Sequence, residues 1–198
     1  MAKTAFSKQI VMPPSLDPGD VRLLLLISNL HRKWGKHRLS QMGHWFDGWK
    51  LDAIFAGIPG QGAEDAWWST SSLIETARLT GTSVTGGAAD IFKCVDQIPR
   101  VFLKVILLMA GFPPAILDAY LRFHDNLQVY NNLAGGFGKP FKKRCSIPQG
   151  CPWSMLFIAI LLRPLILLTK QPGVIVTRIL ADDILLMGFG EGHVIAFI

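Results

Sequence analysis

The chain has 198 residues, half of them hydrophobic, and a formal net charge of +6 from 20 basic and 14 acidic residues. This length fits one large domain or two small ones, and so much apolar sequence excludes a disordered chain. The surplus of positive charge favours a polyanionic partner, either nucleic acid or an anionic membrane surface.

The cysteines indicate neither a disulfide framework nor a zinc site. There are three, Cys94, Cys145 and Cys151, with no C-x-x-C pair and no histidine near them at ligand spacing. We therefore expect a reducing, intracellular location, nuclear or cytoplasmic. Residues 1–12 contain no apolar stretch followed by small residues, so no secretory signal is expected.

Three apolar stretches, 23–27, 105–109 and 155–168, are too short to cross a bilayer. A spanning helix needs about 20 apolar residues in succession, and Arg163 and Pro164 interrupt the longest stretch. We expect all three to form buried core helices, with no membrane as a partner.

The remaining pattern predicts an α+β fold with its strands near the acidic positions. In chain order the first predicted elements are a helix from Glu64 to about Leu79, a strand over 83–92, and helices over 100–110 and 115–123. A hairpin over 127–147 with a glycine-rich tip follows, and then a helix from Pro152 to about Leu168. The last predicted elements are a strand over 174–180, a turn over 181–183 and a return strand from Ile184.

Carboxylates mark the candidate chemistry. Asp182 and Asp183 are adjacent at the tip of the predicted β-turn-β, and Asp90 stands near the end of a separate strand. An Asp-Asp pair between strands is by itself usually just a turn. Here two further segments accompany it in a fixed order.

The segments 90–96, 146–152 and 180–183 read D-I-F-K-C-V-D, S-I-P-Q-G-C-P and L-A-D-D. In this order they resemble palm motifs A, B and C of reverse transcriptases, particularly those of non-LTR retroelements and group II introns. Upstream, the region around Arg22 resembles the fingers, and 60–65 resembles the helix between fingers and palm. The resemblance implies a polymerase palm over 81–198, with an antiparallel sheet and helices packed on its back face, and a partial fingers region over 1–80.

The resemblance also implies RNA-templated DNA synthesis by two-metal nucleotidyl transfer. Asp90 and Asp182 would be the principal ligands of two Mg²⁺ ions, with Asp183 in support, because hard cations take carboxylate oxygens. Three converging carboxylates would otherwise repel one another. The implied partners are an RNA template, a DNA primer and deoxynucleoside triphosphates.

Five further residues are candidates for substrate binding by the same resemblance. Pro148, Gln149 and Gly150 would position template and nucleotide, since glycine permits close approach and glutamine both donates and accepts. Val95 stands where the family has a bulky residue that excludes the ribose 2′-hydroxyl, and Arg22 would meet the triphosphate. The structural alternative for Pro148, Gln149 and Gly150 is a loop that leads into a buried helix. The alternative for Arg22 is a solvated arginine ahead of a core helix.

Other polar and aromatic residues favour structural roles. The basic run 139–144 is typical of a solvated face, with phosphate contact as the alternative, and His124 is expected to serve packing. Five tryptophans are expected in the core rather than stacked on bases: Trp34, Trp45, Trp49, Trp67 and Trp68.

Several positions depart from the family pattern, among them Leu180, Cys151 and Trp153. Only 15 residues follow Asp183, so we expect the chain to be a fragment without thumb or primer grip. A catalytically inactive nucleic-acid-binding remnant is therefore the alternative to an active enzyme. A membrane-associated helical protein and a viral RNA-dependent RNA polymerase fit the pattern less well.

Overall fold

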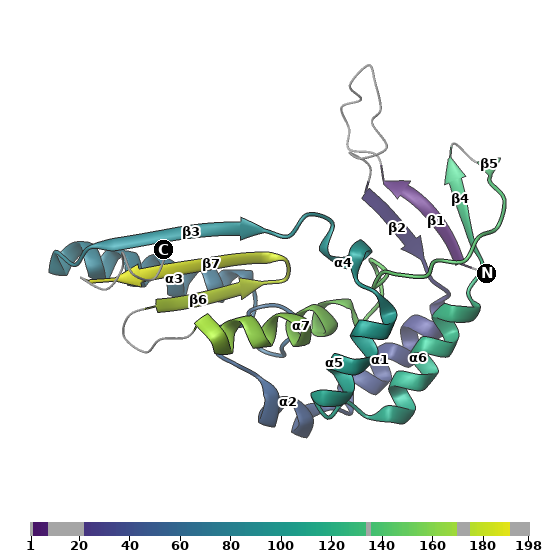
Figure 1. Cartoon of the computed structure of the whole chain (residues 1–198), viewed down its shortest axis with the longest axis horizontal. Helices are drawn as coiled ribbons and strands as arrows, with labels where there is room; N and C mark the ends of the chain where they lie inside the picture. The colour runs from purple at the N-terminus through teal and green to yellow at the C-terminus, as the bar shows by residue number, and fades with distance from the viewer. Residues whose placement is uncertain (1, 8–21, 134–135, 170–174, 191–198) are drawn as a thin grey trace, which may run out of the picture. The chain divides into compact units, whose positions relative to one another are not determined.

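A computed structural model of the chain describes residues 2–7, 22–133, 136–169 and 175–190 (Figure 1). These residues form seven helices and two sheets, which confirms the α+β class. The chain divides into two compact units, each made of two separate segments: 1–42 with 95–154, and 43–94 with 155–198. The expected division between fingers and palm at residue 80 stays a prediction, because compactness alone does not assign functional regions.

The first unit combines a four-stranded sheet with helices. Its sheet order is β2-β1-β4-β5, in which β1 pairs antiparallel with β2 and parallel with β4. The strands are β1 (Ala2–Ser7), β2 (Arg22–Leu26), β4 (Val129–Leu133) and β5 (Gly136–Phe137), and the helices are α1 (Asn29–Ser40), α5 (Arg100–Met109) and α6 (Pro114–Asn126), while the short α4 (Cys94–Gln97) precedes α5.

The expectation of a core helix over 23–27 is wrong, because this stretch lies largely in strand β2. Burial alternates along its end: Leu25 and Ile27 are buried and Leu26 is exposed. That is the period of a strand. A short apolar run has no helical periodicity of its own, so sequence alone does not distinguish the two structures.

Capping and turn residues mark the ends of the helices in the first unit. Ser28 caps α1, because its hydroxyl accepts a hydrogen bond from the His31 N–H at 3.3 Å. Gly111, with φ 72°, follows the end of α5, and Pro114 opens α6, where a missing N–H has no consequence. The expected helices over 100–110 and 115–123 are thereby confirmed.

The second unit contains the acidic positions. Its three-stranded sheet has the order β3-β7-β6, with both pairs antiparallel, as Figure 1 shows. The elements are α2 (Gly43–Trp49), α3 (Ala63–Thr80), β3 (Val84–Asp90), β6 (Ile175–Leu180), β7 (Asp183–Phe189) and α7 (Ser154–Thr169), whose first residue belongs to the first unit.

Local signals set the ends of α3 and α7. The Asp65 carboxylate accepts a hydrogen bond from the Gly62 N–H at 2.8 Å, and Gly81 ends α3 with φ 68°. Helix α7 begins at Ser154 rather than Pro152, because the Ser154 N–H first closes a turn onto the Cys151 carbonyl at 3.1 Å.

Helices contact both faces of the antiparallel sheet. Adjacent strand residues point to opposite faces. On β6 the Thr177 hydroxyl shares a hydrogen bond with Thr169 of α7 (2.9 Å), whereas Arg178 donates one to Ser69 of α3 (2.8 Å). The expectation of helices on the back face alone is therefore incomplete, because α3 covers part of the opposite face.

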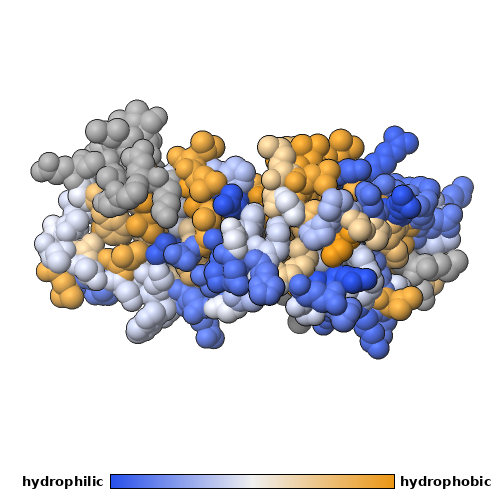
Figure 2. Space-filling view, turned by 90° about the horizontal axis from the view of Figure 1, so that it is seen from below, coloured by the Kyte–Doolittle hydropathy of each residue, from blue (hydrophilic) through white to orange (hydrophobic). Residues whose placement is uncertain are grey.

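Apolar side chains also reach the surface, where they interrupt the hydrophilic areas (Figure 2). Trp67 and Trp68 on α3 are 68% and 70% exposed, so the prediction that they belong to the core is wrong, whereas Trp49 is buried as expected. The reason is that α3 fully buries only Ala77, so that most of the helix surface faces solvent.

Within the described ranges, every helix is too short or too polar to cross a membrane.

Candidate active site

Two of the three candidate aspartates are brought together by strand pairing. Asp90 is the last residue of β3, Asp183 is the first residue of β7, and the two are direct partners in the antiparallel ladder. Asp183 pairs on its other side with Leu180, the last residue of β6. The β6–β7 turn lies between them, with Ala181 in the left-handed region at φ 57°.

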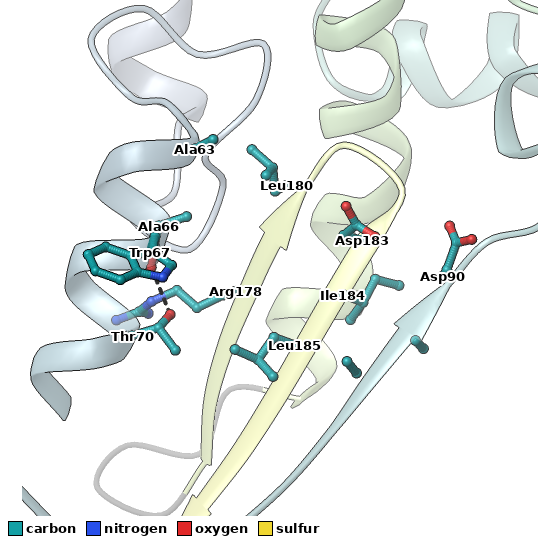
Figure 3. Close-up of a pocket in the computed structure, with 12 residues that line it drawn as sticks. Ala63, Ala66, Trp67, Thr70, Asp90, Arg178, Leu180, Asp183, Ile184 and Leu185 are labelled. Atoms are coloured by element: carbon teal, nitrogen blue, oxygen red, sulfur yellow. Dashed lines mark hydrogen bonds between the residues drawn. The ribbon is translucent and has the colours of Figure 1, made fainter. Parts of the chain in front are cut away.

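The paired carboxylates project from the same end of the sheet (Figure 3). Direct cross-strand partners have Cβ atoms about 4.5–5.5 Å apart on one face, and like charges in such a pair destabilise it. Both aspartates are exposed, so solvent and ions reach them. A cation at this end of the sheet would relieve the repulsion.

Asp182 occupies the turn beside this pair. Its carbonyl accepts a hydrogen bond from the Ile91 N–H at 3.3 Å, which ties the turn to the residue after Asp90. Burial raises the pKa of the Cys94 thiol, and the charges on Asp182 and Asp90 raise it further. The carboxylates of Asp182 and Asp90 thus both act on one nearby thiol.

The three aspartates do not yet form a complete metal site. Among the described residues, no choice of one carboxylate oxygen from each aspartate brings all three oxygens within 4.8 Å of one another. Sharing of one metal by Asp90 and Asp182 therefore stays a prediction.

A cavity of about 610 Å³ adjoins the aspartate pair, between α3 and the sheet (Figure 3). Asp90 and Asp183 line it together with Trp67, Thr70 and Arg178, and the rest of the lining is aliphatic: Ala63, Ala66, Ala88, Ala89, Leu180, Ile184 and Leu185. It therefore has carboxylates at one side and a guanidinium and an indole at the other.

Arg178 is a candidate that the sequence reasoning missed. Its guanidinium donates to Ser69 and to the Thr177 carbonyl, and lies 5.5 Å from the centre of the Phe55 ring. Burial lowers its pKa, and the charge of Asp52 opposes that change. The signal available in the sequence was the one cation of a strand that is apolar apart from Thr177. Arg178 lies on the same face of the sheet as Asp183.

The second set of predicted residues surrounds a tight turn in the first unit. The Cys151 N–H donates to the Pro148 carbonyl at 3.0 Å, and Gly150 has φ 91°. This is the pattern of a type II turn, which requires glycine at its third position. Pro148 is buried, Gln149 is half-buried and Gly150 is exposed.

Backbone hydrogen bonds join this turn to the segment after Asp90. The Ile147 N–H donates to the Val95 carbonyl at 2.8 Å, and the Ser146 N–H to the Ile98 carbonyl at 2.9 Å. The structure therefore brings Val95 close to the start of the Pro148–Gly150 turn. These residues belong to the first unit, and the three aspartates belong to the second.

Arg22 is described only through its backbone, which pairs with Ser7 in the β1–β2 ladder. Its side chain and the preceding residues 8–21 lie outside the described residues. The contact of Arg22 with a triphosphate stays a prediction, although the strand position removes the alternative of an arginine ahead of a core helix.

The basic run is only partly a solvated face. Lys139, Lys142 and Arg144 are exposed. Lys143 instead pairs with Asp96 at 3.3 Å, and its carbonyl accepts a hydrogen bond from Arg100. Three of the four cations therefore face solvent, where a phosphate backbone could reach them.

Comparison of the sequence with protein-family models and with curated proteins gives no match. A function must therefore follow from the residues themselves and their geometry. The feature with the most specific chemistry that the sequence predicted is the carboxylate pair at the end of the sheet.

Proposed function

We propose that this chain is the core of a reverse transcriptase, a polymerase palm with part of the fingers, which adds deoxynucleotides to a DNA primer on an RNA template. The single observation that carries the proposal is the direct pairing of Asp90 with Asp183 beside the turn that contains Asp182. Two further features support the proposal: Asp90 ends a strand, and Pro148 to Cys151 form a tight turn ahead of helix α7.

The carboxylates fit hard divalent cations by their donor chemistry. Asp90, Asp182 and Asp183 offer only oxygen ligands, and two of the three are exposed. They would hold two Mg²⁺ ions, which when bound neutralise the triphosphate and lower the pKa of the primer hydroxyl. The protein's own contribution is to present Asp90 and Asp183 from two paired strands, so that the backbone ladder fixes their spacing, with Asp182 in the adjoining turn.

The turn over Pro148–Cys151 supports a role in positioning the nucleotide. Its two anchors, Pro148 and Cys151, are buried, and Gln149 and Gly150 stand between them closer to solvent. A half-buried amide held on a short turn can donate and accept at a fixed place. The bond from Ile147 to Val95 links this turn to the residue proposed to contact the sugar.

Single-nucleotide addition tests the proposal. The parent chain is incubated with an RNA template, a DNA primer, one complementary deoxynucleotide and Mg²⁺, beside Asp90→Asn, Asp182→Asn and Asp183→Asn. Asp47→Asn is the matched control, because Asp47 is an exposed aspartate of the same unit that pairs with Lys50 on the surface. We expect each of the three site variants to lower the rate at least about 100-fold, since a small misplacement of reacting groups already has that effect.

Folding of every variant is checked by circular dichroism. Unchanged rates in a folded Asp90→Asn variant would contradict the proposal. A folded parent chain that binds an RNA–DNA hybrid in a salt-dependent way, yet adds no nucleotide, would instead favour a nucleic-acid-binding remnant.

A further inference from the structure

Three potential metal ligands from distant parts of the sequence meet inside the first unit. His31 comes from α1, His124 from α6, and Cys151 from the end of the Pro148–Cys151 turn. One ligand atom from each lies within 4.8 Å of the other two, and in the part of the chain that the structure describes this is the one such group. None of the three has a role in the proposed polymerase chemistry.

All three side chains are removed from solvent. His31 is 7% exposed, His124 is 1% exposed and Cys151 is 4% exposed. The Nε2 atoms of both histidines are buried without a hydrogen-bond partner. A buried polar atom without a partner loses its hydration and gains nothing in exchange, so each one calls for an explanation.

The rings are fixed by packing. The His31 ring stacks on Phe123 with centroids 3.8 Å apart and an interplanar angle of 11°. His124 meets His31 edge-on at 84° and 5.4 Å, and lies 4.4 Å from the Tyr120 ring. Packing alone does not account for the histidines, because apolar rings would fill the same space without an unpartnered nitrogen.

The backbone likewise fixes Cys151. Its N–H donates to Pro148, and its carbonyl accepts hydrogen bonds from the N–H and hydroxyl of Ser154. Burial raises the pKa of the thiol to about 12, although a hydrogen bond from the Trp153 backbone works in the opposite direction. A hydrogen bond donated to the sulfur favours its charged form, the thiolate.

We propose that His31, His124 and Cys151 form a buried binding site for one zinc ion. Two imidazole nitrogens and one thiolate are the ligands that zinc takes in proteins, and three protein ligands leave a fourth tetrahedral position for water. Binding forms two Zn–N bonds and one Zn–S bond and releases the thiol proton to solvent. The ion gives both unpartnered nitrogens a partner.

The spacing and the ligand chemistry favour zinc over magnesium. With Zn–N of about 2.0–2.1 Å and Zn–S of about 2.3 Å, tetrahedral ligand atoms lie roughly 3.3–3.8 Å apart, so atoms now within 4.8 Å need only small side-chain adjustments. Magnesium prefers six oxygen ligands and gains little from a thiolate. This site therefore differs in chemistry from the carboxylates of the second unit.

The proposed ion would join three elements that strand and helix hydrogen bonds leave separate. It connects α1 and α6 to the turn that presents Gln149 and Gly150. The role of the ion is therefore structural. The proposed zinc site does not depend on whether the chain is a polymerase.

Cobalt titration of the full chain tests the site. The chain is purified with a chelator, and Co²⁺ is added as a spectroscopic substitute for zinc. We expect a thiolate-to-cobalt charge-transfer band that saturates at one equivalent, disappears on addition of Zn²⁺, and persists in excess Mg²⁺. Cys151→Ser and His124→Gln should lose the band, whereas the exposed Cys145→Ser and His44→Gln should keep it.

Thermal unfolding gives an independent measurement. Zinc should raise the melting temperature of the parent chain and of Cys145→Ser, but not that of Cys151→Ser. Where a variant does not fold, the parent chain decides: a folded parent without a cobalt band or a zinc-dependent shift overturns the proposal. A band that survives in Cys151→Ser but not in Cys145→Ser also overturns it, as does displacement of cobalt by magnesium.

Discussion

Asp183 faces Asp90 on one neighbouring strand and Leu180 on the other. The central strand β7 therefore begins with a carboxylate whose like-charged partner stands on the β3 side only. Negative charge is concentrated there, whereas the residue that faces Asp183 on the β6 side is the apolar Leu180. A cation would therefore bind on the β3 side of Asp183, between the two carboxylates.

The first prediction concerns stability without metal. In the presence of a chelator, Asp183→Asn should raise the free energy of unfolding by about 0.2–1 kcal/mol, because one of two directly opposed charges is removed. Urea denaturation measures this change, and high salt should reduce it. Asp47→Asn, which loses a surface ion pair instead, should give no such gain. A loss of stability in Asp183→Asn would mean that the two carboxylates do not repel.

A close approach of two backbones explains a second expectation. Gly57 has φ 75°, and a Cβ there would lie 2.5 Å from the Met155 carbonyl carbon. Gly57→Ala should therefore cost about 3 kcal/mol or more, from left-handed strain together with the clash. Gly60 is the matched control, since it has φ 79° but open space around it, and Gly60→Ala should cost only about 1–2 kcal/mol. Equal unfolding midpoints for the two variants would contradict this contact.

Thiol reactivity should separate the three cysteines. Cys145 is exposed, whereas Cys94 and Cys151 are buried with raised pKa values, so the last two carry little thiolate near neutral pH. Iodoacetamide labelling of the metal-free native chain, followed by mass spectrometry, should modify Cys145 first. The other two should react only after addition of denaturant. Early labelling of Cys94 would show that the end of the sheet is open to reagent.

Acid should destabilise the metal-free chain through its buried histidines. Burial lowers the pKa of His124 from 6.5 to about 3, with further contributions from the positive charges of His31 and Arg100, and burial also lowers the pKa of His31. The unfolded chain therefore binds more protons below about pH 6.5, and stability should fall as the pH drops from there toward 3. His124 contributes up to about 1.4 kcal/mol per pH unit in that range, and His31 acts in the same direction.

The control for this pH dependence is a pair of histidine variants. His124→Phe should flatten the fall in unfolding free energy between pH 6.5 and pH 4, because one buried titrating group is removed. His44→Gln, at an exposed position, should leave it unchanged. Tyr120 and Cys151 also face this cluster, but their raised pKa values keep them protonated throughout the range.

Sugar selection is the last expectation and depends on the proposed polymerase activity. Val95→Phe should favour deoxynucleotides over ribonucleotides more strongly than the parent does, because a larger ring occupies the space of a 2′-hydroxyl. Val101→Phe, at an exposed position on α5, is the control. The measurement is the ratio of incorporation efficiencies for the two sugars. An unchanged ratio in an active Val95→Phe variant would remove Val95 from this role.

The elements that the sequence predicted well are those with local signals. Asp65 and Gly81 mark the two ends of α3 by their own hydrogen bonds and backbone angle, and the β6–β7 turn follows from two polar residues between apolar runs. The stretch 23–27, most of which lies in β2, was wrongly predicted as a helix because five apolar residues in succession show no periodicity.

Contacts between distant segments could not be predicted in the same way. The register that places Asp90 opposite Asp183 depends on the whole β3–β7 ladder, and only the resemblance to a known motif order suggested their proximity. His31, His124 and Cys151 have no ligand spacing along the chain, since three separate elements bring them together. Rules based on ligand spacing detect metal sites whose ligands lie within one element or loop. They cannot detect this group, because its ligands come from three separate elements.

The β3–β7 ladder also has a consequence for synthesis of the chain. Strand β3 ends at residue 90 and its partner β7 begins at residue 183, so β3 leaves the ribosome long before β7 exists. At about 5–20 residues per second, this delay lasts several seconds or more. The sequence of β3, VTGGAAD, is dominated by small residues. The unpaired edge of β3 is therefore a poor template for aggregation before β7 has been synthesised.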